Sequence, residues 1–303
     1  MYDIVIIGGG PAGLTAAVYA RRAGKSVLVL EKDAFGGQIV QSPRVENFPG
    51  FASITGVELG DRLLAQAMDQ GAEVELEEVV GVRRNTESMT IRCDSGAEFT
   101  ARAIIIATGA KPRSLGIPRE AELLGSGVSY CAVCDGAFYK DRAVAVVGGG
   151  SSALQDALLL SETCAKVYLI HRRDSFRGEQ KLAEALDLRN NIRFVLEAHV
   201  TELLGDEELR GIVVEYRSGE RRELEVDGLF IAVGEEPDNN AFAPLLSLDA
   251  EGYVDAGEDC LAPTPGVFVA GDCRAKRVRQ LTTAVSDGAV AALAAVHWLD
   301  ENA

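Results

Sequence analysis

The stretch YDIVIIGGGPAGLTAAVYARRAGKSVLVLEK, residues 2–32, contains the pattern that decides the fold. Its first apolar segment predicts a β-strand, which runs into three glycines spaced as Gly8-x-Gly10-x-x-Gly13. A helical pattern and a second strand ending at Glu31 follow. This is the βαβ arrangement that binds dinucleotides, with the pyrophosphate at the helix N-terminus. Glu31 can accept hydrogen bonds from a ribose diol, so the site suits an unphosphorylated adenosine ribose, as in FAD or NAD.

The same pattern recurs in AVAVVGGGSSALQDALLLSETCAKVYLIHRR, residues 143–173. Its turn reads Gly148-x-Gly150-x-x-Ala153, and an alanine in the last position still allows close packing of the helix on the strand. The chain therefore contains two nucleotide-binding patterns.

The two copies differ where the first has its acidic residue. At the same offset from the turn the second copy has His171, within the segment HRRDSFR. A carboxylate there would repel a ribose 2′-phosphate, whereas Arg172, Arg173 and Arg177 can bind it through charge-assisted hydrogen bonds. The second site therefore suits NADPH. The alternative is that HRRDSFR is only a solvated basic turn.

Each copy is expected to close with a further strand, in 101–112 (ARAIIIATGAKP) and in 226–239 (VDGLFIAVGEEPDN). A later strand, 267–270, ends at Gly271-Asp272, and an Ala-rich helix begins near Gln280. An Asp at a strand end can hold a ribityl or ribose hydroxyl, although it also serves as a plain turn or cap residue. The start of the helix can face a carbonyl oxygen or an anionic flavin.

These elements predict an α/β fold with two Rossmann-like, doubly wound nucleotide-binding domains, one inserted into the other. The expected boundaries are 1–113 for the first part of the FAD-binding domain, 114–238 for the NADPH-binding domain and 239–303 for the second part of the FAD-binding domain.

Composition and charge restrict the possible partners. The chain has 303 residues, of which 47% are hydrophobic and 25% charged, with a net charge of −16. A duplex-binding protein needs a basic face, so nucleic acid is not an expected partner. No apolar run is long enough for a membrane span, and no signal-peptide pattern is present, so we expect a cytoplasmic protein. The basic run RAKRVR, 274–279, is local and suits a phosphate or an acidic patch.

Six cysteines are present, and only Cys131 and Cys134 are closely spaced, in SYCAVCDGAF. Structural zinc usually needs four ligands, and the three histidines are scattered, so no metal is expected. In a reducing cytosol a lone Cys-x-x-Cys is more often catalytic than structural. The other four cysteines are interpreted as small apolar fillers: Cys93, Cys164, Cys260 and Cys273.

A dithiol beside a flavin and NADPH forms an electron relay, in which the flavin reduces the Cys131–Cys134 disulfide and the dithiol exchanges with an outside disulfide. Attack requires a thiolate, so one sulfur needs a lowered pKa. The adjacent Asp135 can give or take the proton, or can act simply as a cap or turn residue.

The chain resembles the low-molecular-weight thioredoxin reductases over essentially its whole length. The resemblance rests on the motifs GGGPAG, GGQ (36–38), ENFPGF (46–51), ATGA, CAVCDGAFYKD, GGGSSA, HRRDSFR and GVFVAGD…RQLTTAVSDGA. It implies a homodimer that reduces thioredoxin with FAD and NADPH. It also implies that Cys134 faces the flavin, that Cys131 attacks thioredoxin, that Asp135 donates the proton, and that the NADPH domain rotates between two poses.

The fingerprints and the resemblance together predict two sets of cofactor contacts. For FAD they are Gly8, Gly10, Pro11, Ala12, Gly13, Glu31, Lys32, Gly37, Gln38, Asn47, Ala107, Thr108, Gly109, Gly271, Asp272, Arg279, Gln280 and Leu281. For NADPH they are Gly148, Gly150, Ser151, Ser152, Ala153, His171, Arg172, Arg173, Arg177, Val233 and Gly234.

The sequence departs from the family pattern near the expected nicotinamide end, where Ser151, Gln155 and Asp156 replace the usual residues, and Leu281 stands where Ala is common. The alternatives are a ferredoxin- or flavodoxin-dependent thioredoxin reductase, a flavin-dependent dithiol oxidase, a ferredoxin–NADP reductase relative and a non-enzymatic redox sensor. Relatives that use ferredoxin or flavodoxin tend to lose the arginine cluster, which this sequence retains.

Overall fold

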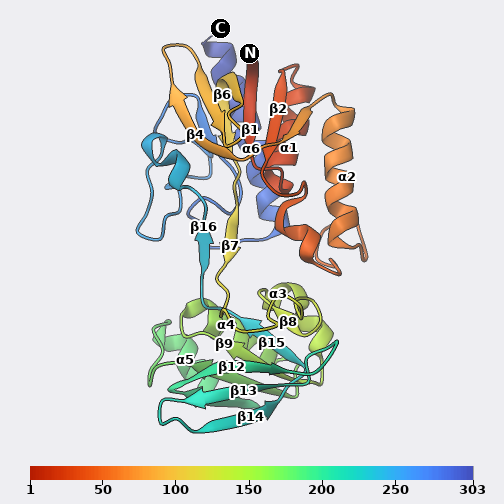
Figure 1. The fold of residues 1–303 in the computed structure, drawn as a ribbon, viewed down its shortest axis with the longest axis vertical. Coiled ribbons are helices and arrows are strands. Elements are labelled where there is room, and N and C mark those ends of the chain that lie inside the picture. Colours follow the sequence, from red (N-terminus) through yellow and green to blue (C-terminus); the bar gives the residue numbers. More distant parts are fainter. Residues whose placement is uncertain (303) are drawn as a thin grey trace. The chain divides into compact units, whose positions relative to one another are not determined.

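The computed structural model describes residues 1–302, and these divide into two compact units (Figure 1). Unit 1 combines Met1–Lys111 with the chain from Glu236 onward, and unit 2 is Pro112–Glu235. The chain passes between the units through β7 (Ala110–Pro112) and β16 (Glu235–Pro237), which pair as a two-stranded sheet. The predicted α/β fold, with one nucleotide-binding unit inserted into another, is confirmed.

Unit 1 is built on a sheet of order β3-β2-β1-β6-β5-β4, with β17 also paired to β6. The pairs among β1, β2, β3, β6 and β17 are parallel, whereas β4, β5 and β6 pair antiparallel. The strands are β1 (Tyr2–Ile7), β2 (Val27–Glu31), β3 (Glu73–Leu76), β4 (Val79–Arg84), β5 (Met89–Cys93), β6 (Glu98–Ile106) and β17 (Val267–Val269). The helices are α1 (Pro11–Arg22), η1 (Gly37–Gln41), α2 (Gly56–Asp69), η3 (Asn240–Leu245) and α6 (Leu281–Glu301).

Both faces of the central strand β1 are buried, which explains its unbroken apolar sequence. Ile4 and Ile6 pack with α1 and α6 in one core, whereas Val5 and Ile7 pack with β5 and η3 in another. Helices therefore cover one face of the sheet, and side chains of η3 and of the sheet's own antiparallel strand β5 pack together on the other face.

Unit 2 repeats this plan with a parallel sheet of order β11-β10-β9-β15-β8 and a separate antiparallel sheet of order β12-β13-β14. The parallel strands are β8 (Val128–Ser129), β9 (Ala143–Val147), β10 (Lys166–His171), β11 (Ile192–Leu196) and β15 (Gly228–Ile231). The antiparallel strands are β12 (Ala198–Leu204), β13 (Gly211–Tyr216) and β14 (Arg221–Glu225). The helices are α3 (Ala132–Asp135), η2 (Gly136–Tyr139), α4 (Ser151–Ser161) and α5 (Gln180–Asp187).

The core of unit 2 is likewise divided by its sheet. Val144 and Val146 of β9 pack with α4, and Ala145 and Val147 pack against the antiparallel sheet. In a parallel sheet of this order, ligands bind at the carboxyl ends of the strands where the strand order reverses. That point is the end of β1 in unit 1 and the end of β9 in unit 2.

Small residues bring α6 onto α1. A Cβ on Gly288 would lie 2.2 Å from the carbonyl oxygen of Ala12 and 3.1 Å from Cβ of Thr15. The close packing of these two helices therefore depends on the absence of a side chain at residue 288.

Gly288→Ala is expected to lower the free energy of unfolding by about 1–3 kcal/mol, because the clash with backbone displaces α6. Helix propensity alone predicts the opposite sign, a gain of about 1 kcal/mol. The denaturant midpoint measures the change. Ser286→Ala, at an exposed position of the same helix, is the control and is expected to stay within about 0.5 kcal/mol. A Gly288→Ala protein as stable as the parent would contradict the packing argument.

Candidate active site

The first glycine turn connects β1 to α1 through backbone contacts that exclude side chains. Gly8 has a φ of +111°, and a Cβ there would lie 2.3 Å from the carbonyl oxygen of Ala107, which directly follows the neighbouring strand β6. A Cβ on Gly13 would lie 1.9 Å from the carbonyl oxygen of Gly8. α1 begins after Gly10 with no side chain capping its N–H groups. The turn therefore offers free backbone donors to an anion, as the sequence pattern predicts.

Glu31, at the end of β2, holds this turn in place. Its Oε2 accepts a hydrogen bond from the Gly9 N–H at 2.7 Å, and its Oε1 accepts one from the Asp33 N–H at 3.0 Å. The predicted ribose acceptor is thus already oriented by two backbone donors.

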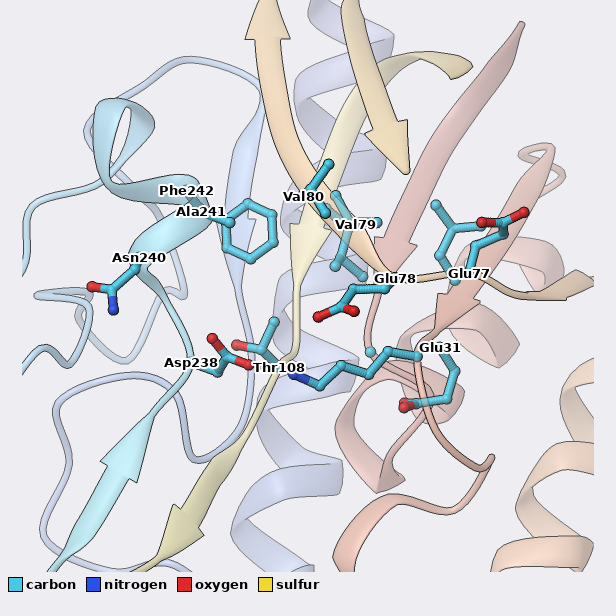
Figure 2. A pocket seen from close by; sticks show the side chains of 14 residues that line it. Glu31, Glu77, Glu78, Val79, Val80, Thr108, Asp238, Asn240, Ala241 and Phe242 are labelled. Atoms are coloured by element: carbon cyan, nitrogen blue, oxygen red, sulfur yellow. Dashed lines mark hydrogen bonds and ion pairs between the residues drawn. The ribbon is translucent and has the colours of Figure 1, made fainter. Parts of the chain in front are cut away.

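Glu31 also lines a cavity of about 330 Å³ at the ends of β1 and β2 (Figure 2). The lining residues are Ile7, Gly8, Leu30, Glu31, Lys32, Glu77, Glu78, Val79, Val80, Thr108, Asp238, Asn240, Ala241 and Phe242. Lys32, the one lysine among them, forms an ion pair with Asp238, and the hydrogen bond to this carboxylate raises the lysine pKa. Carboxylates therefore dominate the cavity, which favours hydroxyl donors over phosphate.

Asn239 connects the carboxyl ends of the strands in unit 1, and sequence reasoning missed it. Its Oδ1 accepts a hydrogen bond from the Thr108 hydroxyl at 3.1 Å. Its Nδ2 donates to the carbonyl oxygens of Gly252 and Cys273, both at 2.9 Å. Asn239 lies in the PDNN segment as one of two adjacent Asn, and nothing in the local pattern distinguishes it.

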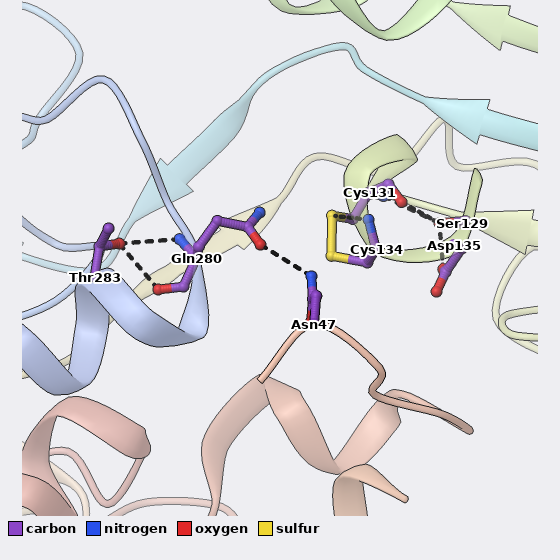
Figure 3. Close-up of a disulfide and its surroundings, with 7 residues drawn as sticks. All are labelled: Asn47, Ser129, Cys131, Cys134, Asp135, Gln280 and Thr283. Atoms are coloured by element: carbon purple, nitrogen blue, oxygen red, sulfur yellow. Dashed lines mark hydrogen bonds between the residues drawn. A yellow bond between two sulfur atoms is a disulfide. The ribbon is translucent and has the colours of Figure 1, made fainter. Parts of the chain in front are cut away.

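Four other predicted FAD contacts, Gly37, Gln38, Asn47 and Gln280, are held by contacts within unit 1. Gly37 lies against the first turn, since a Cβ there would be 3.0 Å from Cα of Gly10. The Gln38 side-chain amide donates to the carbonyl oxygen of Ala110. Asn47 Nδ2 donates to Gln280 Oε1 at 3.3 Å (Figure 3).

Gln280 also caps α6, the helix predicted to begin there. Thr283 and Gln280 form a reciprocal capping box, with the Gln280 N–H donating to the Thr283 hydroxyl at 3.1 Å. Leu281 is the first residue of the helix. The guanidinium of Arg279 lies 4.1 Å from the ring centre of Tyr253.

Asp272 follows β17, as predicted. Its Oδ1 is buried and makes no hydrogen bond among residues 1–302, while the Lys276 ammonium lies 3.4 Å from it. Burial raises the pKa of Asp272, and the cations of Lys276 and Arg279 oppose that rise. A buried acceptor without a hydrogen bond fits a ligand hydroxyl.

The second glycine turn connects β9 to α4 in the same way as the first. A Cβ on Gly148 would lie 2.4 Å from the carbonyl oxygen of Ala232, whereas a Cβ on Gly150 would meet nothing within 4 Å. α4 begins at Ser151 without a side-chain cap. The Ser151 hydroxyl accepts a hydrogen bond from the Glu179 N–H at 3.1 Å. This turn also leaves backbone donors for an anion.

His171 and the arginines after it take different positions. The His171 ring is buried under the turn, so that a Cβ on Gly149 would lie 2.2 Å from its Cε1. Burial, together with the charges of the three arginines, lowers the pKa of His171. Arg172, Arg173 and Arg177 are exposed, and within residues 1–302 no carboxylate forms an ion pair with them. They are therefore available to an external anion.

The remaining predicted NADPH contacts are arranged around the same strands. Ala153 and Ser152 lie in the first turn of α4, with Ala153 fully buried. Val233 and Gly234 follow β15, and the carbonyl oxygen of Gly234 accepts a hydrogen bond from the Arg113 N–H at 2.9 Å.

Cys131 and Cys134 form a disulfide at the start of the short helix α3 (Figure 3). Cys131 is the N-cap residue, and its Sγ accepts a hydrogen bond from the Cys134 N–H at 3.2 Å. The other four cysteines are free and buried, as predicted. Burial raises the pKa of Cys273, which follows Asp272, to about 11, so that it stays a thiol.

Asp135 directly follows Cys134 and is the last residue of α3. Its Oδ2 accepts a hydrogen bond from the Ser129 hydroxyl at 2.6 Å, and the same hydroxyl accepts the Cys131 N–H at 3.0 Å. Oδ1 is buried and has no partner in the described part of the chain. Burial raises the pKa of Asp135, and the Ser129 bond only partly opposes it. A carboxyl group with a raised pKa next to two cysteines suits proton donation.

The fold divides the basic run 274–279. Arg274 and Lys276 are buried against Asp287 of α6, so these two side chains are not part of a surface patch for a phosphate or an acidic partner, whereas Arg277 is exposed. Sequence reasoning missed Asp287, since a lone Asp in an Ala-rich helical pattern is usually on the solvent side.

Comparison with known proteins agrees with this geometry. The model of the pyridine nucleotide-disulphide oxidoreductase family matches residues 2–288. Thioredoxin reductase of Listeria monocytogenes is 43% identical over 99% of this chain and 95% of its own length, and that of Bacillus subtilis is 41% identical over 99% and 96%. The crystal structure of thioredoxin reductase from Streptococcus pyogenes has a TM-score of 0.95, with 37% identity and 99% coverage of both chains. The chain belongs to the pyridine nucleotide-disulphide oxidoreductase family.

Proposed function

We propose that this protein is an NADPH-dependent thioredoxin reductase that uses FAD. The observation that carries the proposal is the Cys131–Cys134 disulfide, with the half-buried Asp135 beside it, in the same unit as the glycine turn and the arginine cluster. Relatives named thioredoxin reductase match the whole chain at about 40% identity. Together they support a dithiol that is reduced from a nucleotide and oxidised by a protein disulfide.

FAD fits unit 1. The uncapped start of α1 suits a pyrophosphate, the Glu31 cavity suits an adenosine without a 2′-phosphate, and the buried Oδ1 of Asp272 suits a hydroxyl of the ribityl chain. When bound, FAD supplies the two-electron chemistry that connects a nicotinamide hydride to a disulfide. The protein residues hold and orient this group.

NADPH fits unit 2. Gly148 and Gly150 let the backbone approach the pyrophosphate, and the uncapped start of α4 provides the donors. Arg172, Arg173 and Arg177 are exposed just after β10, which supports their assignment to a 2′-phosphate. His171, buried below the turn, supports the loop backbone rather than offering a charge.

Cys131 is the residue that we assign to attack thioredoxin. In the reduced pair the Cys134 N–H that now reaches its sulfur would stabilise a thiolate at Cys131. The Cys131 thiolate attacks one sulfur of the substrate disulfide and forms a mixed disulfide, releasing the other sulfur as a thiolate. Cys134 then attacks Cys131, which restores the internal disulfide and releases the second substrate thiolate.

Asp135 is assigned as the proton donor and acceptor of this exchange. Its raised pKa keeps a proton available at a higher pH than an ordinary carboxyl group, and its unpartnered Oδ1 is the atom that can carry it. Overall, one NADPH and one proton reduce one disulfide to two thiols.

The family resemblance supports a homodimer in the cytoplasm, and thioredoxin as the protein substrate. It also supports rotation of unit 2 about β7 and β16 to alternate the disulfide and the nicotinamide at the flavin. No helix among residues 1–302 is both long and apolar enough to cross a membrane. The acidic charge of −16 argues against a nucleic-acid partner.

The proposed function is tested first by an anaerobic NADPH titration of the flavoprotein, followed by flavin absorbance. The parent protein is expected to take up about two hydride equivalents, one for FAD and one for the disulfide, and Cys134→Ala about one. Loss of absorbance with dithionite but not with NADPH would contradict the proposal and favour a ferredoxin-type donor. Consumption of dithiols that needs O₂ and ignores NADPH would favour the oxidase.

Preference for NADPH over NADH is expected to depend on the arginine cluster. Arg173→Ala should lower kcat/KM for NADPH by about 10–100-fold, because it removes a charge-assisted hydrogen bond worth about 1.5–3 kcal/mol, and should leave kcat/KM for NADH unchanged. Arg217→Ala, at an exposed arginine of unit 2 outside the cluster, is the matched control. An equal loss of kcat/KM with NADPH and NADH would contradict the assignment of Arg173 to the 2′-phosphate.

Reactivity of the reduced pair is expected to be unequal. With limiting iodoacetamide on the reduced protein, mass spectrometry should find Cys131 alkylated before Cys134, because Cys131 has the stabilised thiolate. The four buried cysteines should react only after denaturation, which provides an internal control. Faster alkylation of Cys134 would reverse the assignment of the attacking residue.

A further inference from the structure

A cluster of buried charges lies directly beneath the predicted flavin contact Asp272. Asp287 projects from α6, and its carboxylate accepts four hydrogen bonds. Oδ2 accepts the Gly271 N–H at 3.0 Å, Arg274 Nε at 2.8 Å and Lys276 Nζ at 3.0 Å, while Oδ1 accepts a guanidinium N–H of Arg274 at 2.8 Å. The segment that leaves β17 is thereby fixed to α6.

These groups are almost excluded from water. The side chains of Arg274, Lys276 and Asp287 are 4%, 6% and 7% exposed. Burial alone would raise the pKa of Asp287, but the bonds from Arg274 and Lys276 outweigh it and lower that pKa. Burying three charged side chains costs free energy that apolar residues would not. A hydrogen-bonded network of this kind therefore suggests a role beyond stability.

The charges in this cluster balance only when Asp272 is included. Arg274 and Lys276 contribute two positive charges and Asp287 one negative charge. Glu258 also lies 3.5 Å from Arg274, but its side chain is 95% exposed, so that it contributes little. Lys276 is shared, with its Nζ 3.0 Å from Asp287 and 3.4 Å from the buried Oδ1 of Asp272.

We propose that Asp287 is a positioning residue for the flavin site. By binding the Gly271 N–H and Lys276, it fixes the backbone and the counter-ion of Asp272, so that the Asp272 carboxylate is held ready to accept a hydroxyl of FAD. This inference rests on the proposed function, since it takes FAD as the ligand of unit 1. It assigns Lys276 and Asp287 a role in cofactor affinity that neither sequence motif suggested.

The charge of Lys276 influences the pKa of Asp272 and therefore the pH dependence of FAD binding. The charged groups that face Asp272 are Lys276 and Arg279 from its own segment and Asp287 from α6. Removing the Lys276 charge leaves burial less opposed, which raises the pKa of Asp272. The Asp272 carboxylate then becomes protonated at a higher pH than in the parent protein, and a protonated carboxyl group is a hydrogen-bond donor where the carboxylate was an acceptor. FAD affinity would accordingly fall as the pH drops, beginning at a higher pH than in the parent.

The test measures the dissociation constant of FAD for the apoprotein by flavin fluorescence, as a function of pH. Asp287→Asn is expected to weaken FAD binding by about tenfold, which corresponds to the loss of one charged hydrogen bond. Lys276→Met keeps the Arg274–Asp287 pair, and its FAD affinity is expected to begin falling at a higher pH than that of the parent protein. Asp300→Asn, at an exposed carboxylate of the same helix, is the control and should match the parent.

The outcomes separate this inference from the proposed function. A parent protein that binds no FAD would refute both. A parent that binds FAD, with Asp287→Asn and Lys276→Met showing the same affinity and the same pH profile, would refute the positioning role alone. If Asp287→Asn fails to fold, the pH dependence of FAD binding by Lys276→Met decides. A network with a purely structural role would leave the pH at which FAD affinity falls the same as in the parent protein.

Discussion

The contact between Gly8 and Ala107 is the constraint on which the rest of unit 1 depends. Only a residue without Cβ lets the chain turn away at the end of β1 while its backbone touches the residue that follows β6. This contact fixes where α1 begins relative to the sheet, so that the first N–H groups of the helix lie at the carboxyl ends of the strands. Gly13 and Gly288 extend the principle to α1 and α6. The anion site is therefore a consequence of close backbone packing rather than of any one polar side chain.

Unit 2 uses the same construction, with Gly148 against Ala232 in place of Gly8 against Ala107. Because the phosphate-binding backbone is common to both units, it cannot distinguish one nucleotide from another. The proposed function therefore assigns discrimination to the side chains after the second strand of each unit, where one has a carboxylate and the other has arginines. Duplication of the scaffold thus provides two nucleotide sites, and a few substitutions make them different.

Sequence predicted what depends on local spacing. Both turns, the strands before them and α6 follow from periodicity and glycine positions, and the pairing of Cys131 with Cys134 follows from their close spacing. Asn239 and Asp287 were not predicted, because their partners are distant in sequence and only the fold brings them together. Asp287 was further hidden by its setting in an Ala-rich helix. Buried polar residues of this kind have no pattern of their own, since each is determined by the groups around it.

The exchange of Glu31 for His171 shows why equivalent positions need not have equivalent roles. Glu31 accepts a hydrogen bond from the Gly9 N–H, so its charge is part of the turn. His171 instead packs its ring against Gly149 under the turn, and burial lowers the pKa of this ring. A charged carboxylate at this point would pair with the adjacent arginines and compete with a phosphate for them. The histidine ring packs against the turn without adding a negative charge beside the arginines, and the NADPH specificity proposed for unit 2 relies on this difference.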